Sequence, residues 1–220
     1  MYGEPRQLPI GEDHPQAPTN PYGETKLAVE RMLRWYGEAH GLRSVSLRYF
    51  NAAGADPDGN FGEDRRHETH LLPLILQAAT GRRKEIQVFG GDWPTRDGTC
   101  ERDYIHTDDL AEAHRLAIEA LKSGEQRIYN VGTGTGTTVL EALRACEKVV
   151  GRSIAHRVVG RRAGDPPVLV ARCDKLRREL GWTPRYATID PIVETAWKWQ
   201  QGHPKGYGEK EPQMNTDQHR

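Results

Sequence analysis

An α/β fold is predicted by two features of this 220-residue sequence. Segments with the apolar spacing of amphipathic helices alternate with short runs rich in β-branched and aromatic residues. The helical segments begin at residues typical of N-caps and end at glycines. This alternation is typical of sheets that are covered by helices, so we expect the α/β class.

The first predicted elements follow a proline-rich start. Residues 1–21 contain five prolines and should form a loop. A helix is then expected from Pro21, capped by Asn20 or Thr19, to about Gly41, where glycine favours a stop. The run 45–50 reads as a strand, and the segment 52–68, rich in Gly, Asp and Pro, as a loop.

The rest of the chain continues the alternation. Thr107 or Asp108 should cap one helix, and Thr138 with Glu141 forms a capping-box pattern that starts another. The predicted helices span 71–80, 107–121, 139–150, 174–181 and 190–202, the predicted strands 86–89, 127–131 and 154–159, and a long polar loop 90–101. From about residue 207 the chain is polar and is predicted to be a disordered tail.

Composition narrows the class of function. The 31 basic and 31 acidic residues give zero formal net charge, which argues against a nucleic-acid-binding protein. We find neither an apolar run long enough for a membrane span nor a signal peptide. The odd number of cysteines, with no CxxC, favours a reducing, cytoplasmic location, and Cys146 falls at an apolar helical position that predicts a core residue.

Tyr22 and Lys26 are the strongest local signal for chemistry. They are four residues apart on the first predicted helix and therefore share one face. An ammonium group beside a phenol favours the phenolate, so such a pair can exchange a proton with a sugar or alcohol hydroxyl. Taken alone, the same spacing is more often an ordinary exposed helical pair.

Six segments give this pair a context. In chain order they are PYGETK (21–26), LRYFN (47–51), THLLP (69–73), DGTCERDYIH (97–106), YNVGTG (129–134) and RRAGDP (161–166). The ordered set resembles the extended short-chain dehydrogenase/reductase family of NAD-dependent nucleotide-sugar epimerases and dehydratases, although each segment alone is a weak signal. The resemblance covers residues 2 to about 202 and is strongest to members that interconvert UDP-glucose and UDP-galactose.

The resemblance implies a fold and a cofactor. It implies the C-terminal part of a doubly wound Rossmann-type sheet in residues 1–52, rejoined by the strand near 127–131, and a smaller α/β domain for a UDP-sugar in residues 53–206. Tyr22 would be the catalytic acid/base, Lys26 would contact the nicotinamide ribose of NAD and favour the phenolate, and Phe50 would lie against the cofactor. The sugar would be oxidised at C4, turned as a 4-keto intermediate, and reduced on its other face.

The resemblance also implies a substrate-binding set: Asn51, His70, Leu71, Gln87, Val88, Phe89, Arg102, Arg162 and Asp165. Within it the two arginines would pair with the diphosphate, a task suited to the guanidinium group. Asp165 would accept hydrogen bonds from the uridine ribose. Alternatives remain open, because Arg102 has acidic neighbours that favour a structural ion pair and Arg162 follows Arg161 as in a solvated surface pair. His70 stands at a helix start, where a cap is the commoner role.

Two other site types are not expected. The remaining histidines have no metal-ligand spacing, so we predict no metal. Gly132-Thr133-Gly134-Thr135-Gly136 follows a strand and precedes a helix, as a dinucleotide-binding turn would. Its pattern is GxGxG rather than GxGxxG, and the next strand lacks a terminal acid, so we do not assign it to the cofactor.

No other glycine turn precedes Tyr22, so we expect most of the NAD site to be absent from this chain. A segment of about 100 residues would supply it, and a truncated reading frame is our hypothesis. The isolated chain is expected to be catalytically inactive and poorly soluble, because apolar faces would be exposed. Another nucleotide-sugar epimerase or dehydratase, or a non-catalytic UDP-sugar-binding remnant, remains an alternative. The resemblance further implies a homodimer.

Overall fold

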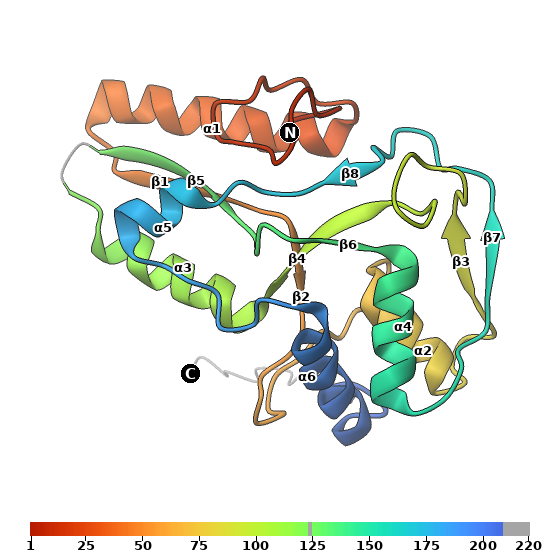
Figure 1. Ribbon diagram of the computed structural model, residues 1–220. Helices are drawn as coiled ribbons and strands as arrows, with labels where there is room; N and C mark the ends of the chain where they lie inside the picture. Colours follow the sequence, from red (N-terminus) through yellow and green to blue (C-terminus); the bar gives the residue numbers. More distant parts are fainter. Residues whose placement is uncertain (123–124, 209–220) are drawn as a thin grey trace, which may run out of the picture.

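The computed structural model describes residues 1–122 and 125–208 and confirms the α/β class (Figure 1). Its helices are α1 (Pro21–His40), α2 (Leu71–Ala79), α3 (Thr107–Glu119), α4 (Val139–Val150), α5 (Asp174–Leu180) and α6 (Ile189–Gly202). Its strands are β1 (Ser44–Tyr49), β2 (Asn51–Ala53), β3 (Ile86–Phe89), β4 (Glu101–His106), β5 (Gln126–Val131), β6 (Gly136–Thr138), β7 (His156–Val159) and β8 (Val168–Leu169). The tail predicted from residue 207 lies almost entirely outside the described residues.

The strands form three small sheets. β1 pairs in parallel with β5, in a register that runs from Ser44 opposite Gln126 to Tyr49 opposite Val131. The strand near 127–131 thus does lie beside the strand that follows the first helix. β2, β4 and β6 form a second sheet in that order, with β8 also paired to β4, and β3 pairs in parallel with β7.

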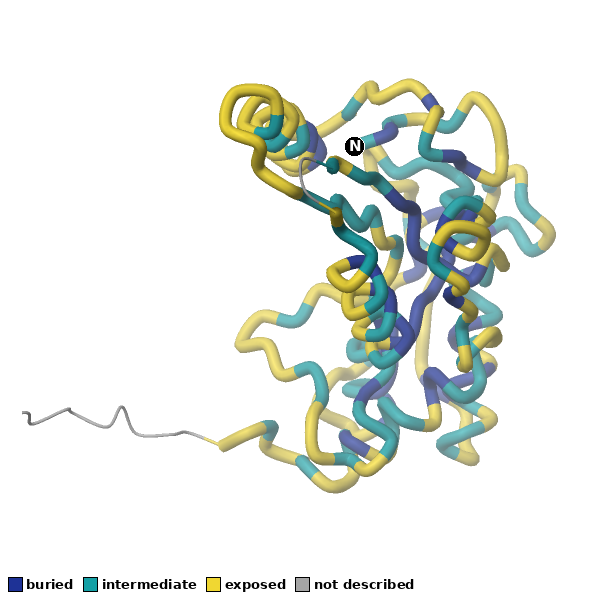
Figure 2. Tube along the Cα trace, turned by 90° about the vertical axis from the view of Figure 1, so that its left-hand side faces the viewer, coloured by how far each residue is buried: buried dark blue, intermediate teal, exposed yellow. Residues whose placement is uncertain are grey.

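Helix α1 begins and ends where its capping residues predict. The Asn20 side chain accepts a hydrogen bond from the Gly23 N–H at 2.8 Å, and Gly41 adopts φ 66°, a left-handed conformation suited to glycine. Only Gly23 and Leu27 of the helix are buried. Its apolar stripe is open to solvent, including Val29, Met32, Trp35 and Tyr36, as expected (Figure 2).

Strand β4 is the main element that the sequence did not predict. Residues 90–101 read as a loop and residues 101–106 only as part of a motif, because three of the first four residues of the strand are charged. In the structure β4 runs through the middle of the molecule and pairs with β2, β6 and β8 (Figure 1). Its Asp103 is fully buried, a position that hydrophobic patterning excludes.

Two apolar clusters hold the elements together. The first packs α2, α4 and α6 around residues such as Ile75, Leu143 and Ile192. The second surrounds Tyr129 of β5 and Trp182, which follows α5. Cys146 is fully buried in the first cluster, as predicted, and the capping box of Thr138 and Glu141 starts α4.

The predicted start of α3 was wrong in detail. The N-cap is His106, whose Nδ1 accepts a hydrogen bond from the Asp108 N–H at 3.0 Å, rather than Thr107 or Asp108. Asp109 does more than place a negative charge near the positive end of the α3 dipole. It is buried, and its two carboxylate oxygens accept hydrogen bonds from the N–H groups of Arg185 and Tyr186, tying α3 to the segment before α6.

His106 gives the fold a predicted pH dependence. Its Nε2 lies 2.9 Å from the Thr195 hydroxyl oxygen, and its ring stacks on Tyr186 with ring centroids 3.8 Å apart. Burial lowers the pKa of His106 below its ordinary value. A lowered folded-state pKa means that the unfolded chain binds the proton more readily, so this contribution to stability is complete above about pH 6.5 and is lost as the pH falls below that value.

The expected result is a free energy of unfolding that decreases between pH 7 and pH 5, measured by urea denaturation. His106→Asn keeps an N-cap acceptor but removes the titrating ring. The free energy of unfolding should therefore change less steeply with pH in this interval. His114→Asn, at an exposed position on α3, is the control and should leave the slope unchanged. An unchanged slope in His106→Asn would refute the assignment of the pH dependence to this ring.

No helix among residues 1–122 and 125–208 is long and apolar enough to span a membrane.

Candidate active site

A cleft of about 650 Å³ lies between the start of α1, the end of β1 and the segment 162–169. A volume of this size is in the range of small-molecule sites. Seven of the residues predicted to form the site line it together: Tyr22, Lys26, Phe50, Asn51, Arg102, Arg162 and Asp165. They come from four separate segments of the chain, so only the fold brings them together.

Tyr22 and Lys26 lie on the first turns of α1, at one side of the cleft. The Lys26 Nζ lies 5.2 Å from the centroid of the Tyr22 ring, so the helical spacing does place the positive charge beside the phenol. Asn20 fixes the helix start by its cap, and thereby the position of both side chains. The Tyr22 side chain is 71% exposed, which leaves its hydroxyl accessible to a ligand.

Arg102, Arg162 and Asp165 line the same cleft from other segments of the chain. Arg162 donates two hydrogen bonds to the Asp165 carboxylate, at 2.9 and 3.0 Å, which raises the pKa of Arg162. Arg102 Nη1 donates to the carbonyl oxygens of Glu101 and Pro166, and its Nη2 lies 4.0 Å from Asp165. Two guanidinium groups therefore share one carboxylate, which leaves a net positive charge for an anion.

Arg102 does form an ion pair, but with Asp165 rather than with its sequence neighbours. The Arg162 side chain is 64% exposed, as in a solvated surface pair, yet it lines the cleft. Arg102 is oriented by backbone carbonyls rather than by Glu101 or Asp103 side chains, and it points into the cleft from the middle sheet.

The other five predicted residues do not line the cleft. Phe89 lies at its border, because its ring centroid is 5.6 Å from the Arg162 guanidinium carbon. Gln87 is exposed on the same alternating face of β3, whereas the Val88 side chain is 1% exposed and packs into the core. Val88 can therefore meet a ligand only through its backbone. His70 and Leu71 lie at the start of α2.

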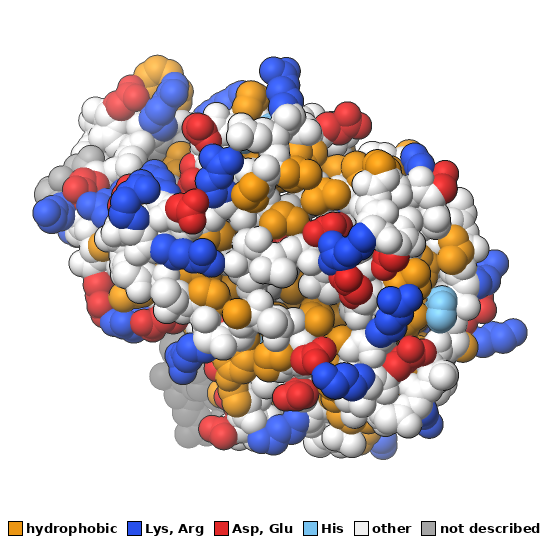
Figure 3. All heavy atoms as spheres, viewed as in Figure 1, with side chains coloured by type: hydrophobic (Ala, Val, Ile, Leu, Met, Phe, Trp, Pro, Cys, Tyr) orange, Lys and Arg blue, Asp and Glu red, His pale blue; other side chains and the backbone are white. Residues whose placement is uncertain are grey.

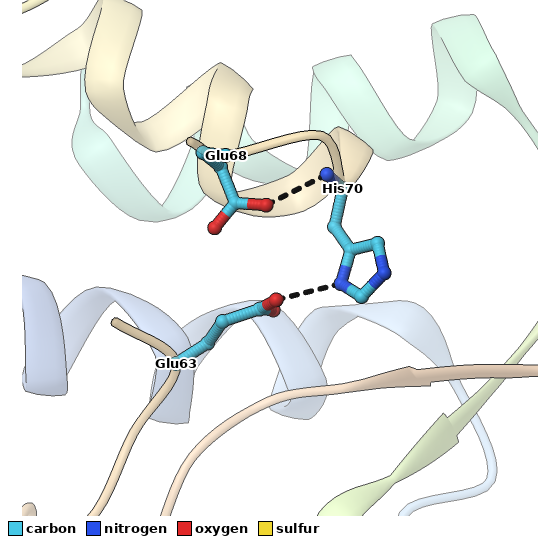
Figure 4. Close-up of side chains that lie close together, drawn as sticks. All are labelled: Glu63, Glu68 and His70. Atoms are coloured by element: carbon cyan, nitrogen blue, oxygen red, sulfur yellow. Dashed lines mark hydrogen bonds and ion pairs between the residues drawn. The ribbon is translucent and has the colours of Figure 1, made fainter. Parts of the chain in front are cut away.

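His70 belongs to a small polar cluster with Glu63 and Glu68 (Figure 4). Its Nδ1 lies 2.7 Å from Glu63 Oε1, and its backbone N–H donates to Glu68 Oε1 at 2.7 Å. One atom from each of the three side chains could coordinate a metal ion, and these atoms lie within 4.8 Å of one another. The spacing of the three residues in the sequence did not reveal this proximity. Arg65 Nε, 2.9 Å from Glu63 Oε1, already places a positive charge beside this carboxylate.

A polar network at one wall of the cleft was not predicted from the sequence. Arg48 donates to both oxygens of Glu30, at 2.8 and 2.6 Å, and to the Tyr2 hydroxyl at 2.7 Å. Tyr2 in turn donates to Asn130 Oδ1 at 2.5 Å. The Arg48 and Glu30 side chains are only 7% and 10% exposed, and burial is the main cause that raises the pKa of Tyr2. The sequence offered one signal for this network, which is that Arg48 is a single arginine inside a predicted strand.

The backbone amides of the glycine loop after β5 bind a carboxylate of the protein itself. Backbone N–H groups of Thr133 and Gly134 donate to the Asp103 carboxylate, at 2.8 and 3.0 Å. The Thr133 hydroxyl and the Ala171 N–H donate to the same carboxylate. These amides are therefore not available to a phosphate, which agrees with the rejection of this loop as a dinucleotide turn.

Comparison with known proteins gives consistent matches. The model of the NAD dependent epimerase/dehydratase family matches residues 1–132. The chain is 52% identical over 210 residues to a UDP-glucose 4-epimerase of Lacticaseibacillus casei, covering 95% of this chain and 63% of that protein.

Two solved structures share the fold. One is UDP-glucose 4-epimerase from Bifidobacterium longum in complex with NAD+ and UDP, with a TM-score of 0.89, 41% identity, and coverage of 94% of this chain and 62% of that one. The other is UDP-glucose 4-epimerase from Brucella ovis in complex with NAD, with a TM-score of 0.84, 48% identity, and coverage of 89% and 61%.

The chain thus spans less than two thirds of the length of these relatives. Within that span the agreement is continuous, and the matched residues 1–132 make up more than half of the 220 residues. The chain belongs to the NAD dependent epimerase/dehydratase family.

Proposed function

We propose that the cleft binds the UDP portion of a UDP-sugar, and that the chain contributes to NAD-dependent interconversion of UDP-glucose and UDP-galactose. The observation that carries the proposal is that Tyr22 and Lys26 line one cleft together with Arg102 and Arg162. An acid/base pair and an anion-binding pair in one cleft suit a substrate with a reacting sugar at one end and a diphosphate at the other. The similar structure from Bifidobacterium longum, a complex with NAD+ and UDP, supports this assignment.

The diphosphate is assigned to the arginine side. Arg102 is held by two carbonyl oxygens through Nη1, so its remaining N–H groups are oriented before a ligand arrives. A guanidinium fixed in this way loses little side-chain entropy on binding. Asp165, between the two arginines, is the acceptor for ribose hydroxyls, and Asn51 is assigned to the sugar. A firm hold on UDP would leave the hexose free to turn.

The proton is assigned to Tyr22. Its exposed side chain, as the phenolate, accepts the proton of the sugar 4-hydroxyl in the oxidising direction and returns it as the phenol in the other, while Lys26 places a positive charge beside the ring. When bound, NAD supplies the hydride acceptor and donor for C4. Of the described residues, Tyr22, Lys26 and Phe50 would hold its nicotinamide end. The glycine loop does not fit its pyrophosphate, because Asp103 occupies the amides.

UDP binding is the property to measure, since the chain spans less than two thirds of its relatives. Isothermal titration calorimetry should detect saturable binding of UDP and markedly weaker binding of uridine, which lacks the diphosphate. Arg102→Gln and Arg162→Gln should each weaken UDP binding about tenfold or more, the loss expected for a charge-assisted pair with phosphate.

Arg115→Gln is the matched control, because Arg115 is an exposed arginine on α3 that pairs with Glu112 and Glu119. It should bind UDP as the unmodified chain does. Equal affinity for UDP and uridine, or unchanged affinity in both cleft variants, would overturn the assignment of the diphosphate to these arginines.

A further inference from the structure

A second cavity, of about 470 Å³, lies on a different part of the molecule. It is bounded by β6, by one face of α4, and by the segment 187–192 that leads into α6. None of its lining residues lines the nucleotide-sugar cleft. Figure 3 shows basic and acidic side chains interspersed over the face that carries β6 and α4, with apolar atoms visible between them.

Among the described residues that line this cavity, Arg144 is a cation without an ion-pair partner. Arg96 pairs with Glu101 at 2.9 Å and with Glu141, and Lys148 pairs with Asp190. Arg144 lines the same cavity between Glu141 and Lys148 on α4. Within residues 1–122 and 125–208 no carboxylate forms an ion pair with Arg144, and no hydrogen bond of its side chain is present. The carboxylates here are thus already neutralised, and the guanidinium is not.

Tyr104 supplies an independent sign of a ligand. Its side chain lines the cavity and is only 5% exposed, yet its hydroxyl has no hydrogen-bond partner among the described residues. The hydroxyl is not sealed from solvent, so a molecule in the cavity that Tyr104 lines can reach it. Burial raises the pKa of Tyr104, so its hydroxyl stays a donor.

The remaining wall is apolar. Ala145 and Ile192 are buried in the core cluster, and Ile189 packs against it, so together they present hydrocarbon to the cavity. A ligand that packs against this surface needs an apolar body. To bind Arg144 and Tyr104 as well, it needs a negatively charged hydrogen-bond acceptor. The volume admits a molecule of roughly metabolite size.

We propose that this cavity is a second small-molecule site, which takes an organic anion, a carboxylate or a phosphate monoester, with a compact apolar body. Arg144 pairs with the anion, the Tyr104 hydroxyl donates a hydrogen bond to it, and Ala145, Ile189 and Ile192 contact the body. The site is independent of the proposed UDP cleft.

The test uses benzoate and phenyl phosphate as probes, with benzyl alcohol as the uncharged control. Calorimetry or ligand-observed NMR on the chain, with UDP present to fill the cleft, should show saturable binding of at least one anion and tighter binding than of the alcohol. Arg144→Gln should weaken anion binding about tenfold, and Tyr104→Phe about threefold or more. Arg178→Gln, an exposed arginine on α5, should change nothing.

Tyr104→Phe removes a hydroxyl that has no hydrogen-bond partner among the described residues, so the melting temperature of this variant should not fall. An unchanged melting temperature separates loss of the site from loss of the fold. Crystals soaked with 4-bromobenzoate should place the bromine, by its anomalous signal, between α4 and the segment 187–192. The proposal fails if no anion saturates below about 10 mM, if benzyl alcohol binds equally well, if Arg144→Gln leaves binding unchanged, or if the bromine lies in the UDP cleft.

Discussion

Arg48→Ala is expected to lower the free energy of unfolding by about 3–5 kcal/mol, because it removes the guanidinium that pairs with the buried Glu30 carboxylate and leaves the Gln16 amide as its remaining donor among the described residues. Glu30 on α1 and Arg48 on β1 form a two-pronged pair with side chains 10% and 7% exposed. The same guanidinium holds the Tyr2 hydroxyl and the Glu12 carbonyl oxygen, at 2.7 and 3.1 Å. It therefore joins the N-terminal segment, α1 and β1 at one wall of the cleft.

Urea denaturation followed by circular dichroism measures this effect. Arg34→Ala breaks the exposed Arg34–Glu38 pair on the same helix and should cost less than about 1 kcal/mol. The double variant Arg48→Met, Glu30→Leu removes both charges and should recover most of the loss. If Arg48→Ala costs no more than Arg34→Ala, the buried pair does not hold α1 against β1.

Asp103→Asn is expected to destabilise the fold by about 3 kcal/mol or more, although it changes only one atom of the side chain. All four partners of the carboxylate are donors: the N–H groups of Thr133, Gly134 and Ala171, and the Thr133 hydroxyl. An amide keeps one acceptor but turns an NH₂ group toward two of these donors. Two charge-assisted hydrogen bonds are then replaced by donor–donor contacts.

Urea denaturation should show a lower midpoint concentration, while the dependence of the unfolding free energy on urea concentration stays the same. This combination indicates a change in stability rather than a change in the surface exposed on unfolding. Asp92→Asn is the matched control, because the Asp92 side chain is 75% exposed and should contribute within about 0.5 kcal/mol. A loss in Asp103→Asn as small as in this control would mean that the carboxylate is not what fixes the loop 132–134 to β4 and β8.

Local signals in the sequence predicted the elements that local interactions determine. The start of α1 follows from the Asn20 cap, its end from Gly41, and the start of α4 from the capping box at Thr138. β4 was missed because its stability comes from pairing with three strands from distant parts of the chain, which outweighs the poor strand propensity of its charged residues.

The candidate site divides in a similar way. Tyr22 and Lys26 could be paired from helical spacing alone. The convergence of Arg102 with Arg162 could not, because it depends on the pairing of β4 with β8, and only the family resemblance suggested it. The Arg48 network and the unpartnered Tyr104 hydroxyl left no sequence pattern, since both depend on what surrounds a single side chain. The homodimer stays a prediction.

A crystal structure of this chain with UDP tests the central claim most directly. We expect the diphosphate oxygens within hydrogen-bonding distance of the Arg102 and Arg162 guanidinium groups, the ribose hydroxyls at Asp165, and the terminal phosphate directed toward Tyr22. UDP bound elsewhere on the surface, or a cleft that remains empty at saturating UDP, would contradict the assignment of this cleft to a nucleotide sugar.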